Sequence, residues 1–124
     1  MALERSLLEI SKPAAADLST YQYRGVLIAA GSVNIATGTA SAIIGVLQNK
    51  PSAAGAAARV AIGGVTKMIA SASITAGAWV AVNGEGMGVT AAVGDNATQA
   101  VGRALETASG SLSVFELLIM PQSI

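Results

Sequence analysis

The sequence has no cysteine and no histidine, and its 124 residues include only one tryptophan, one phenylalanine and two tyrosines. Without cysteine there are no disulfide bonds and no thiolate chemistry, which argues against a small disulfide-stabilised secreted scaffold. Without either residue the usual zinc ligands are missing, and the Ser-His-Asp and Cys-His arrangements of nucleophilic catalysis are excluded by composition. No Ser-x-x-Lys motif occurs either. We therefore expect a protein that is not an enzyme and that holds no metal ion and no cofactor.

Charged residues are few and balanced, seven basic against seven acidic. The acidic residues are scattered singly, so the sequence offers no carboxylate cluster for a calcium or magnesium ion. No group of lysines and arginines is present to neutralise phosphates, and the aromatic residues are not interleaved with basic ones as a single-strand binder requires. The composition therefore argues against a nucleic-acid partner, and no motif indicates a small-molecule substrate.

Long uninterrupted apolar runs are also absent. Glu4, Arg5 and Glu9 break up the first ten residues, so these do not match the pattern of a signal peptide. The segment 25–49 carries no charge and is long enough for a spanning helix, but polar residues and glycines divide it into short runs. We expect no membrane partner.

Small residues make up much of what is present. The hydrophobic fraction is 52%, but alanine accounts for 26 residues. Because alanine buries little surface, we expect few large side chains in the core of a chain of this length. A chain of this size fits one domain with one core. Burial of further surface against copies of itself or a partner would stabilise such a domain.

The N-terminal region differs in composition from the rest of the chain. Residues 1–20 hold much of the charge together with isolated apolar residues, and Pro13 would stop a helix before it grew. We expect residues 1–20 to form an extended arm that is flexible until a partner holds it. Residues 21–124 would then form a single β-rich domain.

In the body, short β-branched or aliphatic runs alternate with turn residues, a pattern typical of strands. We expect a mainly β fold, a small Gly/Ala-rich β-barrel or β-sandwich, with at most one short helix. Alanine favours a helix in the segments 52–60 and 97–106, but each contains a glycine. The expected strands are 25–30, 33–36, 42–48, 58–62, 66–70, 78–82, 88–93, 100–106 and 113–120.

The body also contains a weak internal repeat. The region 26–62 can be aligned with the region 79–119, and Gly45 then matches Gly102. Solenoid arrays need three or more copies, so two copies predict a pseudo-symmetric barrel with the segment 63–77 as its connection.

Four residues are candidates for the core or for a subunit interface. Trp79, Val80 and Val82 lie in one expected strand, in which Val80 and Val82 alternate with the residues between them. A lone aromatic residue such as Trp79 buries well without a ligand. Phe115, in the last expected strand, is the other large ring of this group.

Four segments occur in a characteristic order: GVLQNKP (45–51), RVAIGGVTK (59–67), ITAGAWV (74–80) and AVGRALE (100–106). In this order the sequence resembles the capsid decoration proteins of tailed bacteriophages, the cement or head-stabilising proteins of the lambda type. The similarity covers most of the chain from Gly45 onward.

The resemblance implies a β-tulip-like fold and a homotrimer on the outer surface of the expanded phage head. The protein would be made in the cytoplasm of the bacterial host and would clamp neighbouring capsomers of the major capsid protein. An N-terminal arm that becomes ordered on docking would make the contact, and its docking residues would be Leu3, Leu7, Leu8, Ile10 and Pro13.

Two other functions remain open at this stage. One is a non-enzymatic β-domain for adhesion or surface display, for which more exposed aromatic residues would be usual. The other is a small β-barrel that binds a ligand, which would need a sizeable polar-lined cavity.

Overall fold

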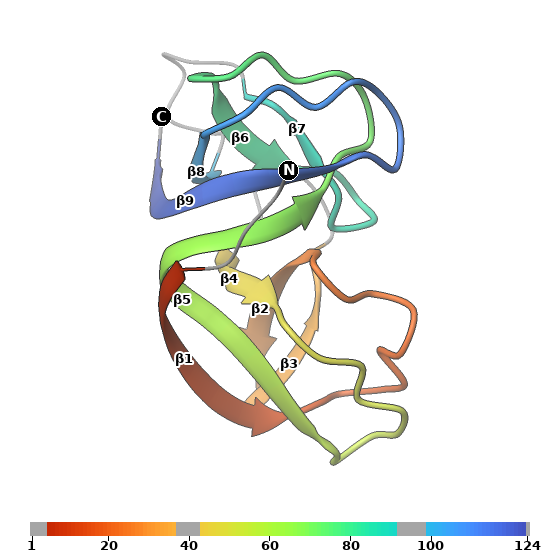
Figure 1. Ribbon diagram of the computed structural model, residues 1–124. Helices are drawn as coiled ribbons and strands as arrows, with labels where there is room; N and C mark the ends of the chain where they lie inside the picture. Colours follow the sequence, from red (N-terminus) through yellow and green to blue (C-terminus); the bar gives the residue numbers. More distant parts are fainter. Residues whose placement is uncertain (1–4, 37–42, 92–98, 124) are drawn as a thin grey trace.

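Figure 1 shows the computed structural model, which describes residues 5–36, 43–91 and 99–123. All regular structure within these residues is β, and the prediction of a mainly β fold is confirmed. The expected strands at 58–62 and 66–70 form one continuous strand. The strands are β1 (Arg5–Pro13), β2 (Gly25–Ala29), β3 (Ser32–Ile35), β4 (Ile43–Leu47), β5 (Ala57–Ile69), β6 (Trp79–Val82), β7 (Gly88–Thr90), β8 (Gln99–Ala104) and β9 (Val114–Ser123).

The nine strands belong to one antiparallel sheet. Hydrogen-bonded neighbours follow the order β3-β2-β4-β5-β9-β8-β6-β7, and β1 pairs with β5 outside this path. The sheet is not closed into a barrel. Isolated parallel bridges curl each half of the sheet, from Ala14 to Val33 in β3 and from Ala70 to Gly88 in β7. In Figure 1, β5 runs from the lower half, with β1 to β4, into the upper half, with β6 to β9.

The strands repeat one pattern of pairing twice. Among the first five strands, β1 pairs with β5, β2 with β3, β2 with β4, and β4 with β5. Among the last five, β5 pairs with β9, β6 with β7, β6 with β8, and β8 with β9. We call β1–β5 unit 1 and β5–β9 unit 2. The strand β5 is therefore the last strand of unit 1 and the first strand of unit 2.

Backbone hydrogen bonds outside the ladders repeat in the same way. The N–H of Ala14, after β1, donates to the carbonyl of Ala56, and the N–H of Ala70, after β5, donates to that of Ser113, both at 2.8 Å. The segment 63–77, expected to connect two halves, thus begins with the second half of β5 and takes part in unit 2.

Two glycines occupy corresponding positions in the units. A Cβ atom on Gly45 would overlap the carbonyl oxygen of Ala61 in β5, and one on Gly102 would overlap that of Leu118 in β9. Only glycine lets the neighbouring strand backbones approach so closely. The sequence alignment of Gly45 with Gly102 therefore joins two residues with the same structural role.

Each unit has its own group of buried side chains, and β4 and β5 stand between the two groups. Alternate residues of a strand point to opposite faces of the sheet. Leu47 and Val60 accordingly lie in the unit 1 core, whereas Val46 and Ala61 lie in the unit 2 core. Buried residues of unit 1 are Ala14, Leu18, Val26, Val33, Leu47, Ala58 and Val60. The larger unit 2 core includes Ile43, Met68, Ile74, Val101, Leu117 and Ile119.

The four core or interface candidates lie in unit 2. Val80, Val82 and Phe115 are fully buried in its core. Trp79 is half-buried on the opposite face of β6, and the guanidinium carbon of Arg103 lies 4.4 Å from the centre of its ring.

The expected boundary at residue 20 does not separate an arm from the body, and for residues 5–20 the expectation of a free arm is wrong. Residues 5–13 are β1, which pairs with β5 from Ala57 to Val65. Ala14 and Leu18 are only 2% and 1% exposed in the unit 1 core. The β1 ladder and these two buried side chains make this region an integral part of unit 1.

The composition of β1 explains why this strand was not expected. Its polar residues suit a strand at the edge of a sheet, where one row of backbone groups faces solvent. Pro13 stops a helix, but it is tolerated in an edge strand where it need not donate to the ladder.

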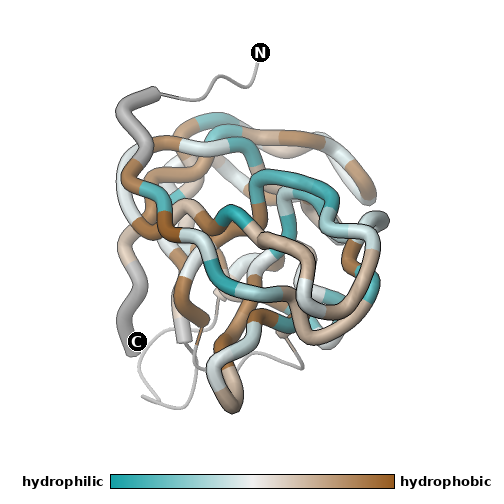
Figure 2. The backbone as a smooth tube through the Cα atoms, turned by 90° about the horizontal axis from the view of Figure 1, so that it is seen from below, coloured by the Kyte–Doolittle hydropathy of each residue, from teal (hydrophilic) through white to brown (hydrophobic). Residues whose placement is uncertain are grey.

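Hydrophobic segments along the chain are short and are interrupted by hydrophilic ones, as Figure 2 shows. Within the described ranges no helix has the length and apolar character to cross a membrane.

Candidate functional site

The outer edge of β1 is the first candidate, because β5 is the only strand that forms a ladder with β1 in the described part of the chain. The N–H of Ala14 donates to Ala56 on the β5 side. Backbone groups alternate along a strand, so the N–H groups of Ile10 and Lys12 also point towards β5. Those of residues 9 and 11 then point outward, and Pro13, which has no N–H, falls on the same outer edge. Just beyond Pro13 this outer side meets β3, where the N–H of Ala15 donates to the carbonyl of Val33 at 2.8 Å. Among the described residues the β1 edge is thus open to a further strand at residues 9–11.

The predicted docking residues do not form one surface. Leu8 is 61% exposed and lies beside Gly63 of β5, whereas Ile10 packs against the unit 1 core. Pro13 is exposed at the end of the strand. Leu3 and the side chain of Leu7 lie outside the described residues. The structure therefore brings Leu8 and Pro13 to the surface and leaves Ile10 partly buried against the unit 1 core.

One ion pair joins β1 to β5 on the surface. The guanidinium of Arg59 lies 3.5 Å from the carboxylate of Glu9. Exposed pairs of this kind contribute little to stability, about 0–1 kcal/mol. The ladder and the buried side chains therefore hold β1 more than this pair does.

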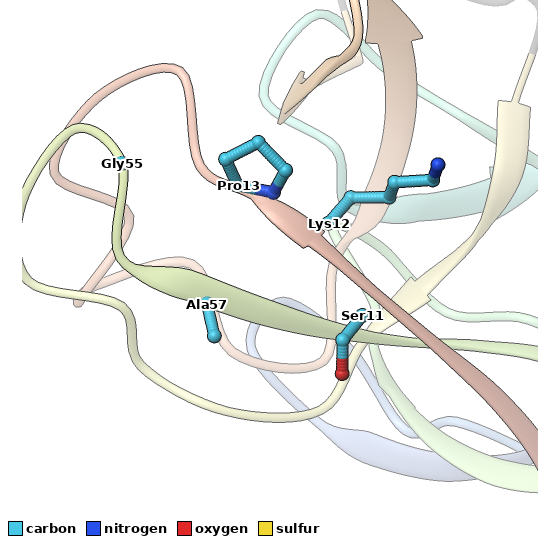
Figure 3. Close-up of a pocket in the computed structure, with 5 residues that line it drawn as sticks. All are labelled: Ser11, Lys12, Pro13, Gly55 and Ala57. Carbon is cyan, nitrogen blue, oxygen red and sulfur yellow. The ribbon is translucent and has the colours of Figure 1, made fainter.

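A shallow hollow of about 240 Å³ lies where the end of β1 meets the loop between β4 and β5 (Figure 3). Its lining residues are Ser11, Lys12, Pro13, Gly55 and Ala57. In Figure 3 the side chain of Lys12 extends away from Gly55, so the hollow has no cluster of converging polar groups. It adds an open contact surface at the end of the β1 edge.

A second hollow, of about 230 Å³, lies where the two units meet, and we call it the seam hollow. It is lined by residues from the segment between β1 and β2, from the loop between β4 and β5, and from the end of β5. The lining residues are Ser19, Thr20, Gln22, Tyr23, Lys50 and Ile69. Sequence reasoning missed this site, because its residues are common surface types from three separate segments and no spacing connects them.

The tryptophan and both tyrosines each have a cation over one face of the ring. Besides Arg103 over Trp79, Arg24 lies 5.1 Å from the ring centre of Tyr21, and Lys67 lies 5.7 Å from that of Tyr23. Cations are attracted to the negative face of an aromatic ring. These rings are therefore engaged within the protein on one face, each by a basic residue.

One ionisable group near the seam hollow is perturbed. The side chain and backbone of Ser19 form hydrogen bonds that lower the pKa of the Asp17 carboxyl below its ordinary value of 3.8. The backbone N–H of Ser19 donates to Asp17 Oδ1 at 2.9 Å. This exposed turn fixes the start of the segment that lines the hollow.

No group of three or more acidic side chains that could hold a metal ion occurs in the part of the chain that the structure describes. The candidate site therefore consists of a strand edge and two hollows. No protein-family model matches the sequence, and no curated protein matches it either.

Proposed function

We propose that this protein is a virion structural protein that binds the outer surface of an expanded phage capsid and stabilises the shell. The resemblance of the sequence to phage decoration proteins suggests this role, and the observation that carries it is the open outer edge of β1. Its partner would be the major capsid protein of the same phage, and the working form would be a homotrimer. No catalytic step is part of the proposal.

The β1 edge supports docking by strand addition. An extended segment of the capsid protein could pair with the outward N–H and C=O groups of residues 9 and 11, which would extend the sheet by one strand. Each backbone hydrogen bond adds about 0.5–1.5 kcal/mol net, so a few of them give a weak contact per subunit. Because a trimer offers three such edges to a symmetric lattice, avidity would turn weak contacts into stable attachment.

Docking on this edge requires little reorganisation of the protein. Residues 5–13 are already held on β5, so most of the entropy cost of ordering them has been met during folding. The exposed Leu8 beside the edge would add apolar contact to the backbone hydrogen bonds. The capsid segment would therefore meet a preformed strand.

Co-sedimentation with expanded, undecorated shells of the same phage tests the proposal. Deletion of residues 1–20 would remove Ala14 and Leu18 from the core, so point variants are preferable. In Ser11→Pro the outward N–H is lost while the ladder to β5 is kept, and we expect binding to weaken roughly three- to tenfold per contact.

Lys12→Pro is the matched control, because it removes an N–H on the β5 side of the same strand. This variant should lose thermal stability, whereas Ser11→Pro should keep the melting temperature of the original protein. Unchanged shell binding by a folded Ser11→Pro variant would contradict docking through β1. Absence of any binding to shells would contradict the decoration role and favour adhesion or display.

A further inference from the structure

Three residues other than glycine have a positive φ among those described: Tyr23 at 65°, Ala30 at 52° and Leu112 at 65°. Such a backbone conformation is uncommon and unfavourable for residues that carry a Cβ atom. Two of the three flank the end of β5. The N–H of Ile69 donates to the carbonyl of Tyr23 at 3.0 Å, and the N–H of Leu112 donates to that of Ala70 at 2.7 Å.

The internal repeat provides a counterpart for Tyr23. The N–H of Tyr23 donates to the carbonyl of Leu47 at the end of β4, and the N–H of Gly77 donates to that of Ala104 at the end of β8, both at 2.7 Å. Gly77 has the same left-handed backbone, with a φ of 91°. At this position one unit therefore uses glycine and the other a tyrosine.

Leu112 has a glycine counterpart as well. Its N–H donates to Ala70 after β5, as the N–H of Gly55 donates to Ala14 after β1. Gly55 has a φ of 86°. In both comparisons the position next to the end of β5 carries a large side chain on a left-handed backbone. The equivalent position of the other unit is glycine. Strain of this kind is typical of functional positions.

Both positions adjoin the end of β5, and the last residue of β5 lines the seam hollow. Tyr23 and Ile69 line it, and Val114 pairs with Ile69 across the β5–β9 ladder. Leu112 is 64% exposed and Val114 46%, and the N–H of Leu112 donates to Ala70, the residue after Ile69, so two exposed apolar residues adjoin the end of β5. A volume of about 230 Å³ can take one or two side chains of a binding partner.

The lining of the hollow also includes polar residues and one basic residue. Lys50 lines it together with the hydroxyl groups of serine and threonine, and no acidic residue is among its lining residues. The Lys67 ammonium group lies over the ring of Tyr23. Of the acidic neighbours, Asp17 accepts the N–H of Ser19, and Glu116 is opposite Lys67 in the ladder. Lys50 is the one charged residue among the described lining residues of this hollow, so its ammonium group can attract a carboxylate of a ligand.

We propose that the seam hollow, with Leu112 and Val114 beside it, binds an extended segment of a partner protein that carries an apolar side chain next to a carboxylate. The apolar side chain would pack against Leu112 and Val114, and the carboxylate would lie beside Lys50. This surface is separate from the β1 edge, and the inference does not depend on the decoration role.

The test is a titration of the full-length ¹⁵N-labelled protein with the peptide acetyl-Gly-Leu-Asp-Leu-Gly-amide, followed by NMR. We expect saturable amide shifts at Tyr23, Lys50, Ile69 and Leu112, with a dissociation constant of the order of 1 mM for so short a ligand. The matched peptide with asparagine in place of aspartate should bind roughly two- to fivefold more weakly, because it lacks the charge.

Leu112→Gly is the decisive variant. It should keep or raise the melting temperature, because glycine adopts this backbone without strain, and it should lose the peptide shifts. Leu8→Ser is the control, since Leu8 is exposed to a similar degree, at 61%, but lies on β1. Leu8→Ser should bind the peptide as the original protein does.

Three outcomes would overturn the proposal: no shifts up to about 10 mM peptide, equal binding of both peptides, or full binding by Leu112→Gly. Concentration-dependent shifts of the same residues in the free protein would also overturn it, since a second copy of the chain would then occupy the surface.

Discussion

Replacing Gly45 or Gly102 with alanine tests the structural repeat directly. In each case the new Cβ would overlap a carbonyl oxygen of the adjacent strand, Ala61 for the first and Leu118 for the second. The partner is backbone, so the clash cannot be relieved by turning a side chain. The paired strands must separate or bend at this point.

The expected cost follows from what the separation breaks. Moving β4 away from β5 weakens the ladder at Val46–Ala61 and Leu47–Val60, all of which are buried. Two weakened backbone hydrogen bonds cost about 1–3 kcal/mol, and overpacking adds about 1–3 kcal/mol. Alanine recovers about 0.5–1 kcal/mol by restricting the unfolded chain. We therefore expect each variant to lose about 1–5 kcal/mol, a large share of the stability of a small domain.

The assay is urea denaturation monitored by far-UV circular dichroism and by the fluorescence of Trp79, the only tryptophan. Gly63→Ala serves as the control, because a Cβ there would lie 3.5 Å from the Cβ of Leu8, an ordinary contact. It should change stability by less than about 1 kcal/mol. If Gly45→Ala and Gly102→Ala differed strongly from each other, or both cost less than about 1 kcal/mol, the equivalence of the two units would be refuted.

Three further predictions concern single contacts. Leu18→Ala should cost about 2–5 kcal/mol in urea denaturation, since Leu18 is 1% exposed; a loss below about 0.5 kcal/mol would show that residues 14–20 are not part of the core. Thr66→Val removes the hydroxyl that accepts the Gln48 Nε2 hydrogen at 2.8 Å and should cost about 1–3 kcal/mol, whereas adding Gln48→Leu should recover part of the loss; additive losses would contradict this. Ser19→Ala should raise the Asp17 pKa in an NMR titration, because a hydrogen-bond donor is lost. Since the folded-state pKa is lowered, the stabilisation is present above the ordinary value of 3.8 and is lost as the pH falls through the folded value; an unchanged titration curve would show that the Ser19 hydroxyl does not lower this pKa.

Strand identity in the body could be predicted from local pattern, because short β-branched runs between turn residues reflect the backbone directly. The β8 strand formed although alanine and arginine in it also favour a helix, since Gly102 is required for close approach to β9. The segments 58–62 and 66–70 were expected as separate strands, but β5 continues through Gly63 and Gly64. Glycine ends many strands, yet in β5 it lets one strand pass from one unit to the next.

The N-terminal strand and the seam hollow could not be predicted in the same way. Residues 5–13 acquire their strand structure from pairing with β5, more than forty positions later in the sequence, and their own composition resembles that of a solvated arm. The seam hollow depends on Tyr23 and Lys50 meeting the end of β5, which no local periodicity reveals. The left-handed backbone at Leu112 could not be predicted from the sequence either. Such a turn normally contains glycine, as at the counterpart Gly55, and a leucine gives no indication of it.

The shared strand β5 places both proposed binding surfaces on one element. Its first half carries β1, whose outer edge would receive a capsid strand, and its last residue, Ile69, lines the seam hollow. Because β5 contributes to both cores, neither unit can open without loss of burial in the other. A ligand on either surface should therefore slow hydrogen exchange along the whole of β5, not only at the half that it touches. Protection confined to one half would show that the two units open independently, and the two surfaces would then be uncoupled.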